Sequence, residues 1–293
     1  MKVEDVERPL VEVKGLRIAF GDAVPVRNVS FTVPPHGRVA LVGESGCGKS
    51  LTAMSLWKRG QTKPRISYIF QNPMDSLNPV MKIGAQIHEA ADGITREEIV
   101  ELLRRTGLED PARVYDSYPC RLSGGQCQRA MIAMALAAKP ELLVADEPTT
   151  ALDVTTQREV LELIDSLAEE TGMAVLLITH NLGLVAGRMD TVNVMYAGEI
   201  VESGPVAEVL SNPRHPYTQG LLKAVPALDA PMDAPLADIP GTVPPPDAWP
   251  SGCAFHPRCP YATEECSRVS PPERVCGAVR FRCHAPFEGE GGK

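Results

Sequence analysis

Apolar and polar positions follow two kinds of pattern along the chain up to about residue 203. Residues 11–20 (VEVKGLRIAF) alternate apolar and polar side chains with a slip at Gly15, which predicts a half-exposed strand. Continuous apolar runs predict buried strands of a parallel sheet instead. Four such runs lie at residues 38–43, 142–146, 174–179 and 192–196.

Helical spacing occurs between these runs. Thr95, followed three residues later by Glu98, forms a capping box, and Gly107 suits the matching helix end. A second helix is predicted from about Thr155 to Thr171, where the following Gly172 ends it. Because strands and helices alternate, the pattern predicts an α/β domain with a mostly parallel sheet.

The composition changes after about residue 203. Of the 27 prolines, 16 lie in residues 204–293. Proline interrupts helices and central strands, so we expect only a short helix at about 217–224. A proline-rich linker and a small irregular module around the cysteines should follow it.

Length and charge limit the classes of function. The 293 residues, 44% of them apolar, suffice for one large domain and an appendage. A net charge of −8 indicates that the chain as a whole is not a polyanion binder, which leaves a local basic patch open, and no nucleic-acid partner is expected. Apolar runs are too short to cross a bilayer, and the N-terminus lacks the profile of a signal peptide. We therefore expect a cytosolic chain that does any membrane work through a partner.

Residues 43–50 (GESGCGKS) fit the phosphate-binding pattern G-x-x-x-x-G-K-[ST], between an apolar strand and a predicted helix at 51–57. In this reading the backbone amides curl around the phosphates, Lys49 adds a full charge and the Ser50 hydroxyl ligates Mg²⁺. The alternative is a glycine-rich turn that binds nothing. The predicted nucleotide contacts are Gly43, Glu44, Ser45, Gly46, Cys47, Gly48, Lys49, Ser50 and Leu51.

Two apolar strands end in residues suited to phosphate chemistry. Residues 142–147 (LLVADE) end in Asp146, which would hold Mg²⁺, and Glu147, which would polarise the attacking water. His180 ends the strand at 174–179 and could contact the γ-phosphate. The alternatives are a solvated turn before Pro148 and a structural histidine.

Residues 122–126 (LSGGQ) suggest a second anion site. Ser123 can cap a helix while the amides of Gly124 and Gly125 face outward. An ordinary helix start is the alternative. The motif, through Gln126, resembles the signature of ABC ATPases. That resemblance implies that it closes over the γ-phosphate of an ATP held by the phosphate loop of another subunit.

Other positions match this family in the same order. Gln71 resembles the glutamine that senses Mg²⁺ and touches the permease, residues 151–153 resemble the D-loop with Asp153, and Phe20 stands where an aromatic stacks on adenine. The resemblance covers residues from about 10 to 225. It implies a P-loop NTPase fold of the ABC type over 8–210, with a helical subdomain at about 72–136.

One departure from the family lies between Lys49 and Gln71. Only the 21 residues 50–70 separate them, whereas the family usually has a longer segment that includes strands of an antiparallel β-subdomain. We therefore expect a reduced β-subdomain. Since all the catalytic positions are present, we still expect an active ATPase.

Finer features resemble the peptide/nickel importer branch of the family. They are residues 70–79 (FQNPMDSLNP), residues 215–218 (HPYT) in a linker region at 211–250, and a cysteine-rich tail at 251–286. The branch implies uptake of oligopeptides, dipeptides, nickel or a related solute. It also implies a second ABC ATPase subunit (a homologue rather than a copy), two membrane permease subunits and an extracytoplasmic solute-binding protein. The chain would then lie peripherally on the cytoplasmic face of the membrane.

The tail carries four spaced thiols, Cys253-x5-Cys259-x6-Cys266-x16-Cys283. All-cysteine ligation suits Zn²⁺ or an iron–sulfur cluster, which would order a segment with little core of its own. The spacing lacks the paired C-x2-C of zinc ribbons, and the resemblance implies a [4Fe-4S] cluster. Free thiols are the third possibility. The segment beyond His215 is expected to pack on the nucleotide domain or on its dimer mate.

Two rival classes remain. A soluble ABC ATPase of DNA repair or translation commonly has two ABC modules or a long coiled-coil insertion, and this chain has neither. A P-loop nucleotide kinase has no use for residues 122–126 and needs a lid over a second substrate, for which the sequence gives no candidate.

Overall fold

The computed structural model describes residues 8–59, 64–150, 152–225 and 238–285. The chain divides into two compact units, which are described separately. The first holds mainly residues 57–177 and the second mainly residues 9–33, 38–56 and 178–293. Both contain strands and helices, so the predicted α/β class is confirmed.

The first unit combines a short parallel strand pair with a group of helices. Strand β4 (Ile66–Ile69) pairs in parallel with β5 (Leu142–Asp146). The long α7 (Val154–Thr171) begins one residue before the predicted start and ends at Gly172, whose backbone is left-handed. Strand β6 (Ala174–Thr179) follows, and its residues up to 177 belong to this unit.

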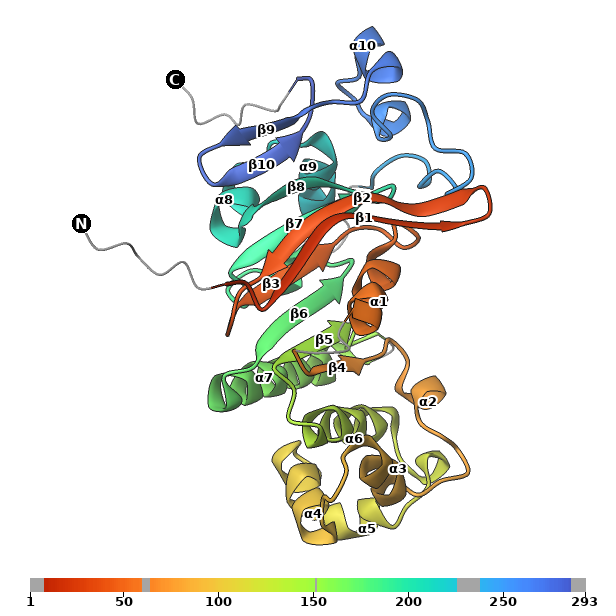
Figure 1. The fold of residues 1–293 in the computed structure, drawn as a ribbon, viewed down its shortest axis with the longest axis vertical. Helices are drawn as coiled ribbons and strands as arrows, with labels where there is room; N and C mark the ends of the chain where they lie inside the picture. Colours follow the sequence, from red (N-terminus) through yellow and green to blue (C-terminus); the bar gives the residue numbers. More distant parts are fainter. Residues whose placement is uncertain (1–7, 60–63, 151, 226–237, 286–293) are drawn as a thin grey trace, which may run out of the picture. The chain divides into compact units, whose positions relative to one another are not determined.

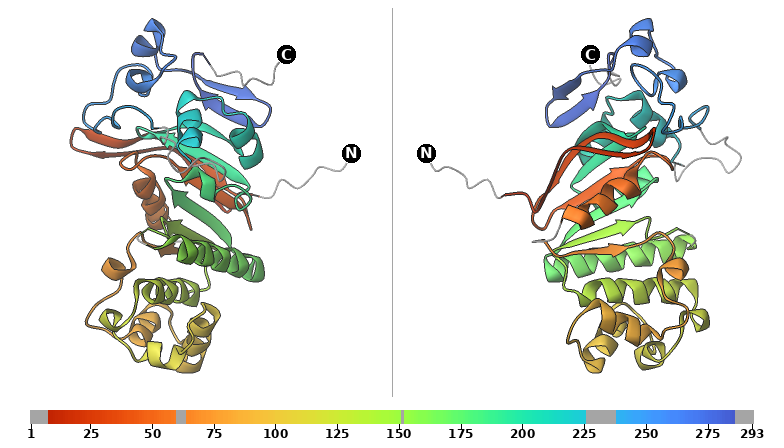
Figure 2. Two further views of the ribbon diagram at one scale, coloured as in Figure 1. Left: turned by 180° about the vertical axis from the view of Figure 1, so that it is seen from behind. Right: turned by 45° about the vertical axis from the view of Figure 1, so that its right-hand side comes forward.

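Five short to medium helices lie between β4 and β5, and four of them, α3 to α6, gather into one group (Figures 1 and 2). Apolar side chains of α3, α4, α5 and α6 meet in a shared core that includes Ile83, Ile99, Leu103 and Cys127. The predicted capping box at Thr95 and Glu98 is present. The helices are α2 (Pro73–Ser76), α3 (Ile83–Ala90), α4 (Arg96–Arg105), α5 (Pro111–Tyr115) and α6 (Gly124–Ala137), with a 3-10 turn, η1, at Pro119–Arg121.

In the second unit, strands from both ends of the chain form a mixed arrangement. The predicted strand β1 (Val11–Phe20) pairs antiparallel with β2 (Ala23–Val33), and the register shifts at Gly15, as the slip in the pattern predicts. Strand β3 (Arg38–Val42) pairs in parallel with β7 (Thr191–Tyr196). Strand β8 (Glu199–Pro205) pairs antiparallel with β7 and meets β2 in parallel.

Helices of the second unit are mostly short. The first, α1, begins at Lys49 and ends at Arg59, two residues beyond the predicted end. The segment between α1 and β4 includes residues 60–63, which lie outside the described ranges, so the expected reduction of the β-subdomain stays a prediction. The others are α8 (Val206–Ser211), α9 (Pro216–Lys223), α10 (Glu264–Arg268) and the 3-10 turns η2 (Leu182–Leu184) and η3 (His256–Arg258).

The C-terminal tail is more regular than its proline content predicts. A hairpin of β9 (Glu273–Cys276) and β10 (Val279–Arg282) follows α10, and β10 pairs antiparallel with β8 (Figure 1). The proline-rich segment is also attached, because Trp249 donates a 2.9 Å hydrogen bond to the carbonyl of Val24 on β2. The module around the cysteines is therefore irregular only in part, since backbone pairing with β8 supplies order that side-chain composition does not reveal.

Candidate functional site

The phosphate-binding loop connects β3 to α1 in the second unit, and its glycines are sterically required. A Cβ on Gly43 would lie 2.1 Å from the carbonyl oxygen of Met195, and one on Gly48 would lie 2.5 Å from that of Pro25. Gly46 and Gly48 also have φ angles of +83° and +101°, in a region that side chains rarely enter. The loop can therefore bring its backbone amides close to a bound phosphate.

Lys49 is held inside this loop. Its side chain is largely buried, and Nζ donates to the carbonyl oxygens of Gly43 (2.7 Å) and Glu44 (3.0 Å). Ser50 is exposed in the first turn of α1 and Leu51 is half-buried. A lysine charge beside a helix N-terminus gives the loop a strong preference for an anion. Burial raises the pKa of the Cys47 thiol, so this cysteine is not a reactive thiolate at neutral pH.

Phe20 and His180 are exposed in the same unit. Phe20 ends β1 with 62% of its surface exposed, as a ring that stacks on a ligand base requires. His180 directly follows β6 and is exposed. Their contacts with adenine and with the γ-phosphate stay predictions.

Asp146, in the first unit, lies at the carboxyl end of β5 and is largely buried. Tyr68 on β4 donates a 2.7 Å hydrogen bond to its Oδ2. Burial, and then the Asp146 charge, raises the pKa of Tyr68, so the phenol stays protonated and keeps donating. An oriented carboxylate at a strand end suits a divalent cation.

Glu147 has an unusual backbone. Its φ is +46°, in the left-handed region, where a non-glycine residue is strained. Gln71 Nε2 and Thr150 Oγ1 each donate to Glu147 Oε2 at 3.0 Å. The structure thus brings the two predicted residues Gln71 and Glu147 together and holds one oxygen of the carboxylate with two donors.

Ser123, Gly124, Gly125 and Gln126 open α6 at the surface of the first unit. Ser123 Oγ accepts from the Gln126 backbone amide at 3.2 Å, and Gln126 Oε1 accepts from the Ser123 amide at 3.1 Å. A Cβ on Gly124 would meet nothing within 4 Å. The turn is therefore a pre-formed, exposed helix N-terminus with open space beside Gly124, and its contact with a phosphate stays a prediction.

Asp153 opens α7 in the same way. Its carboxylate accepts from the Thr156 amide at 3.0 Å and from the Thr156 hydroxyl at 2.8 Å. The first of these bonds is the main reason that the pKa of Asp153 is lowered. Ala151, the first residue of the predicted D-loop, lies outside the described residues.

The four spaced tail cysteines line one small cavity of about 20 Å³. Burial raises the pKa of Cys253 and Cys259 and raises that of Cys283 to about 11. The donor set expected for a metal is thus gathered in one place. Within the described ranges, however, no three His, Cys, Asp or Glu side chains are arranged so that they could hold a metal ion.

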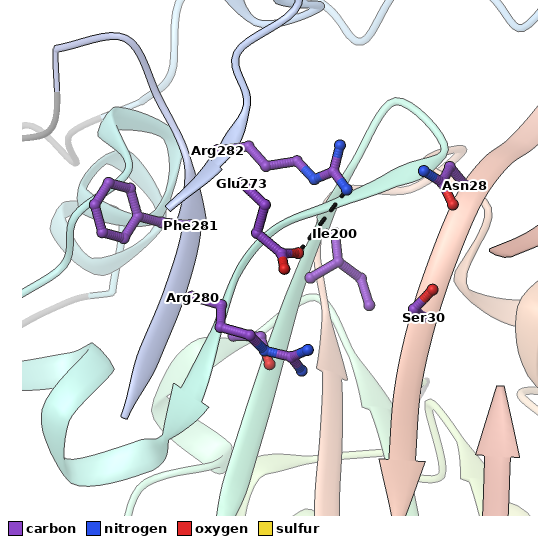
Figure 3. Close-up of a pocket in the computed structure, with 8 residues that line it drawn as sticks. Asn28, Ser30, Ile200, Glu273, Arg280, Phe281 and Arg282 are labelled. Atoms are coloured by element: carbon purple, nitrogen blue, oxygen red, sulfur yellow. Dashed lines mark ion pairs between the residues drawn. The ribbon is translucent and has the colours of Figure 1, made fainter. Parts of the chain in front are cut away.

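A second cavity, of about 200 Å³, lies at a fork in the sheet of the second unit, where β8 changes its partner from β2 to β10 (Figure 3). Asn28 and Ser30 line it from β2, and Arg280 and Arg282 from β10. An ion pair joins Arg282 to Glu273 at 3.9 Å. None of the predicted site residues reaches this cavity.

Sequence reasoning missed several residues that support the site. Tyr68 and Thr150 contact the two carboxylates, and Tyr217 and Arg258 contact the phosphate-binding loop. Thr150 lies three residues after Glu147, so its proximity was readable from the sequence. The others are distant in sequence, and Tyr217 was noted only as part of the HPYT motif.

The comparisons with known proteins agree on one family. Residues 26–150 match the family model described as "ABC transporter", and residues 201–266 match "Oligopeptide/dipeptide transporter, C-terminal region". A relative in Brucella abortus (strain 2308), named as a peptide import ATP-binding protein, is 42% identical and covers 94% of both chains. A similarly named relative in Brucella ovis is 46% identical over 90% of this chain and 93% of its own.

This chain belongs to the ATP-binding subunits of ABC transporters, in the oligopeptide/dipeptide branch.

Solved structures of ABC proteins share the fold. CbiO1 of Clostridium perfringens, described as part of the ABC transporter complex cbiONQ, matches 69% of this chain and 91% of its own with a TM-score of 0.60 and 23% identity. A bacterial Atm1-family ABC exporter with ATP bound matches 70% of this chain and 40% of its own with a TM-score of 0.58 and 27% identity. As an ABC ATPase, the subunit binds ATP with Mg²⁺ and hydrolyses it, and neither rival class is favoured. No helix in the described part of the chain has the length and apolarity to span a membrane.

Proposed function

We propose that this ABC ATPase drives the uptake of oligopeptides or dipeptides, with nickel or a related solute as the alternative cargo. Support comes from the peptide-import names of relatives that match nearly the whole chain and from the matched C-terminal region. The observation that carries the transport mechanism is the exposed, self-capped turn at Ser123. A free helix N-terminus on the surface suits an anion that another molecule presents.

In the proposed cycle, the P-loop of one subunit and the Ser123–Gln126 turn of its ATPase mate enclose each ATP. Lys49 would neutralise the phosphates, and Ser50 and Asp146, with Gln71, would hold Mg²⁺. Glu147 orients the attacking water, and its fixed carboxylate suits this role. His180 contacts the γ-phosphate. Phe20 stacks on adenine, and Asp153 lies at the dimer interface.

Closure of the pair moves the permease subunits, and hydrolysis reopens it. The cycle is a two-state switch that is powered by the difference between ATP and ADP binding. The proposed partners are a homologous ATPase subunit, two permease subunits and an extracytoplasmic solute-binding protein that acts through the complex. The subunit would then lie on the cytoplasmic face of the membrane.

The test of this function is isolation of the tagged chain from detergent-solubilised membranes of its own organism. We expect a second ATPase subunit and two permease subunits to co-purify. After reconstitution, a peptide-loaded solute-binding protein should stimulate ATP hydrolysis, whereas the unloaded binding protein should not. Recovery of the chain with ribosomes or DNA, and with no membrane subunit, would support the soluble rival instead.

The tail cysteines are a separate proposal. Cys253, Cys259, Cys266 and Cys283 have the thiol chemistry that a [4Fe-4S] cluster or Zn²⁺ requires, and they line a common cavity. A bound metal or cluster would cross-link this short segment and stabilise it. Iron, zinc and acid-labile sulfide should be measured on the anaerobically purified chain and on a Cys266→Ala variant. We expect a brown protein whose iron is lost in the variant. Stoichiometric zinc would show that the site holds Zn²⁺ in place of the cluster. The absence of both iron and zinc would refute the site.

A further inference from the structure

Glu44 of the phosphate-binding loop forms hydrogen bonds with two side chains from the C-terminal region of the same unit. Its backbone amide donates a 2.8 Å hydrogen bond to the Tyr217 hydroxyl. Its carboxylate receives both terminal nitrogens of Arg258, from Nη1 to Oε2 at 2.8 Å and from Nη2 to Oε1 at 2.9 Å. This two-bond geometry fixes the orientation of the carboxylate as well as its charge.

Arg258 is itself held rigidly. Only 4% of its side chain is exposed, against 29% for Glu44. Its Nε donates to the carbonyl of Pro240 at 2.8 Å, and Nη2 also donates to that of Ile239 at 3.0 Å. The guanidinium further lies 5.8 Å from the ring centre of Tyr196. A buried, fully bonded guanidinium cannot move without leaving charges and carbonyl groups unpaired.

Tyr217 is equally constrained. It is fully buried, and its ring packs against Tyr196 and Phe255 with centroids 4.7 and 5.4 Å away. The backbone before it is fixed too, because Glu202 accepts from the amides of Arg214 (2.6 Å) and His215 (3.0 Å). The Tyr217 hydroxyl is therefore a fixed acceptor for the Glu44 amide.

These contacts converge on the residue that also holds the lysine of the loop. The Glu44 carbonyl accepts from Lys49, while the Glu44 amide and carboxylate are bound by Tyr217 and Arg258. Every polar group of Glu44 is thus fixed. A nest of amides binds phosphate well only if its backbone is already in the binding conformation, because ordering it on binding lowers affinity.

We propose that Tyr217 and Arg258 are positioning residues for ATP binding, through which the C-terminal region holds the phosphate-binding loop in its nucleotide-accepting shape. The proposal rests on ATP binding at residues 43–50 and goes beyond the transport function. It gives the HPYT motif and the tail a role in nucleotide binding that acts through Glu44, apart from the metal proposed for the tail cysteines. In the alternative, the contacts with Glu44 only hold the tail on the domain, and their removal would leave the affinity for ATP unchanged.

The experiment compares variants of the full-length chain for the Kd of a fluorescent ATP analogue, for the KM and kcat of ATP hydrolysis, and for Tm. In Arg258→Met we expect Kd and KM to rise roughly tenfold and kcat to change less, because the loop loses preorganisation. Tyr217→Phe keeps the buried ring and loses only one acceptor, so a rise of about threefold is expected. Arg282→Met is the matched control, since it removes another arginine ion pair of the tail, the one between Arg282 and Glu273 (Figure 3).

A double-mutant cycle with Glu44→Gln separates positioning from attachment. If Arg258 acts through Glu44, Arg258→Met should raise Kd much less in the Glu44→Gln background than in the native one. If Arg258→Met does not fold, Tyr217→Phe alone decides. The proposal is overturned if the Arg258 and Tyr217 variants bind the analogue as tightly as Arg282→Met does, whatever their Tm. Failure of the native chain to bind ATP would instead refute the proposed function.

Discussion

The phosphate-binding loop and the Ser123 turn are both glycine-rich starts of a helix, but they are supported in opposite ways. Glu44 in the loop is held by Tyr217 and Arg258, which are 173 and 214 residues away in sequence. Ser123 is capped by Gln126, only three residues away. One proposed anion site is fixed by the tertiary structure around it, and the cap of the other is complete within a single helical turn.

This difference matches two kinds of ligand binding. A loop that buried groups already hold in place loses little conformational entropy when it binds a nucleotide. A turn whose caps are local can remain exposed and still be rigid, which suits contact with a nucleotide held elsewhere. Gly124 fits the second role, because a Cβ placed there would have no other atom of the described residues within 4 Å.

The largest predicted effect is at Glu147, where a substitution should reduce ATP hydrolysis and leave ATP binding unchanged. Glu147→Gln keeps the shape of the side chain but removes its basicity, so ATP hydrolysis should fall by roughly 100-fold or more. The P-loop is unaltered, so the Kd for ATP should stay within about twofold of the native value, because no phosphate contact is lost. Steady-state hydrolysis and analogue binding measure the two quantities. Undiminished turnover would remove Glu147 from its role.

The second prediction tests the exposed turn. Gly124→Asp places a negative charge where the mate's γ-phosphate is expected, so hydrolysis by the assembled transporter should fall by roughly 100-fold. An acidic residue in the first turn of a helix is not destabilising, and the space is open, so neither Tm nor ATP binding to the isolated chain should fall. A large loss of Tm with unchanged hydrolysis would assign the turn to the core instead.

The smallest effect concerns the local cap at Asp153. Its pKa is lowered from 3.8 in the folded chain, so its stabilising contribution is present above about pH 4 and is lost as the pH falls through the folded value. Asp153→Asn keeps a capping oxygen without the charge. Its Tm should therefore fall slightly less than that of the native chain between pH 5 and pH 3, by about one degree. Parallel curves of Tm against pH for the native chain and Asp153→Asn would show that the Asp153 charge does not contribute to stability.

Local features of the fold and the site were predictable from the sequence. The capping boxes at Thr95 and Ser123, the slip at Gly15 and the end of α7 at Gly172 each depend on residues within a few positions. Such motifs have the same backbone consequence almost wherever they occur. The order of motifs along the chain then sufficed to predict the family.

Long-range features were not predictable in the same way. The β10–β8 pairing and the contact between Arg258 and Glu44 join segments whose spacing carries no signal. The proline-rich composition argued against a strand near residue 280, yet backbone pairing needs only a short extended segment. The left-handed backbone of Glu147 also has no marker in the sequence, since the residue is not glycine.

The central claim is that the Ser123–Gln126 turn completes the binding site of a nucleotide that is held by the P-loop of the other ATPase subunit. The most direct measurement is a structure of the assembled transporter that carries Glu147→Gln, determined with ATP and Mg²⁺. The account predicts Ser123 Oγ and the amides of Gly124 and Gly125 within hydrogen-bond distance of a γ-phosphate bound by the other ATPase subunit's P-loop. A closed, ATP-loaded pair in which this turn faces solvent or its own core, away from any phosphate, would contradict it.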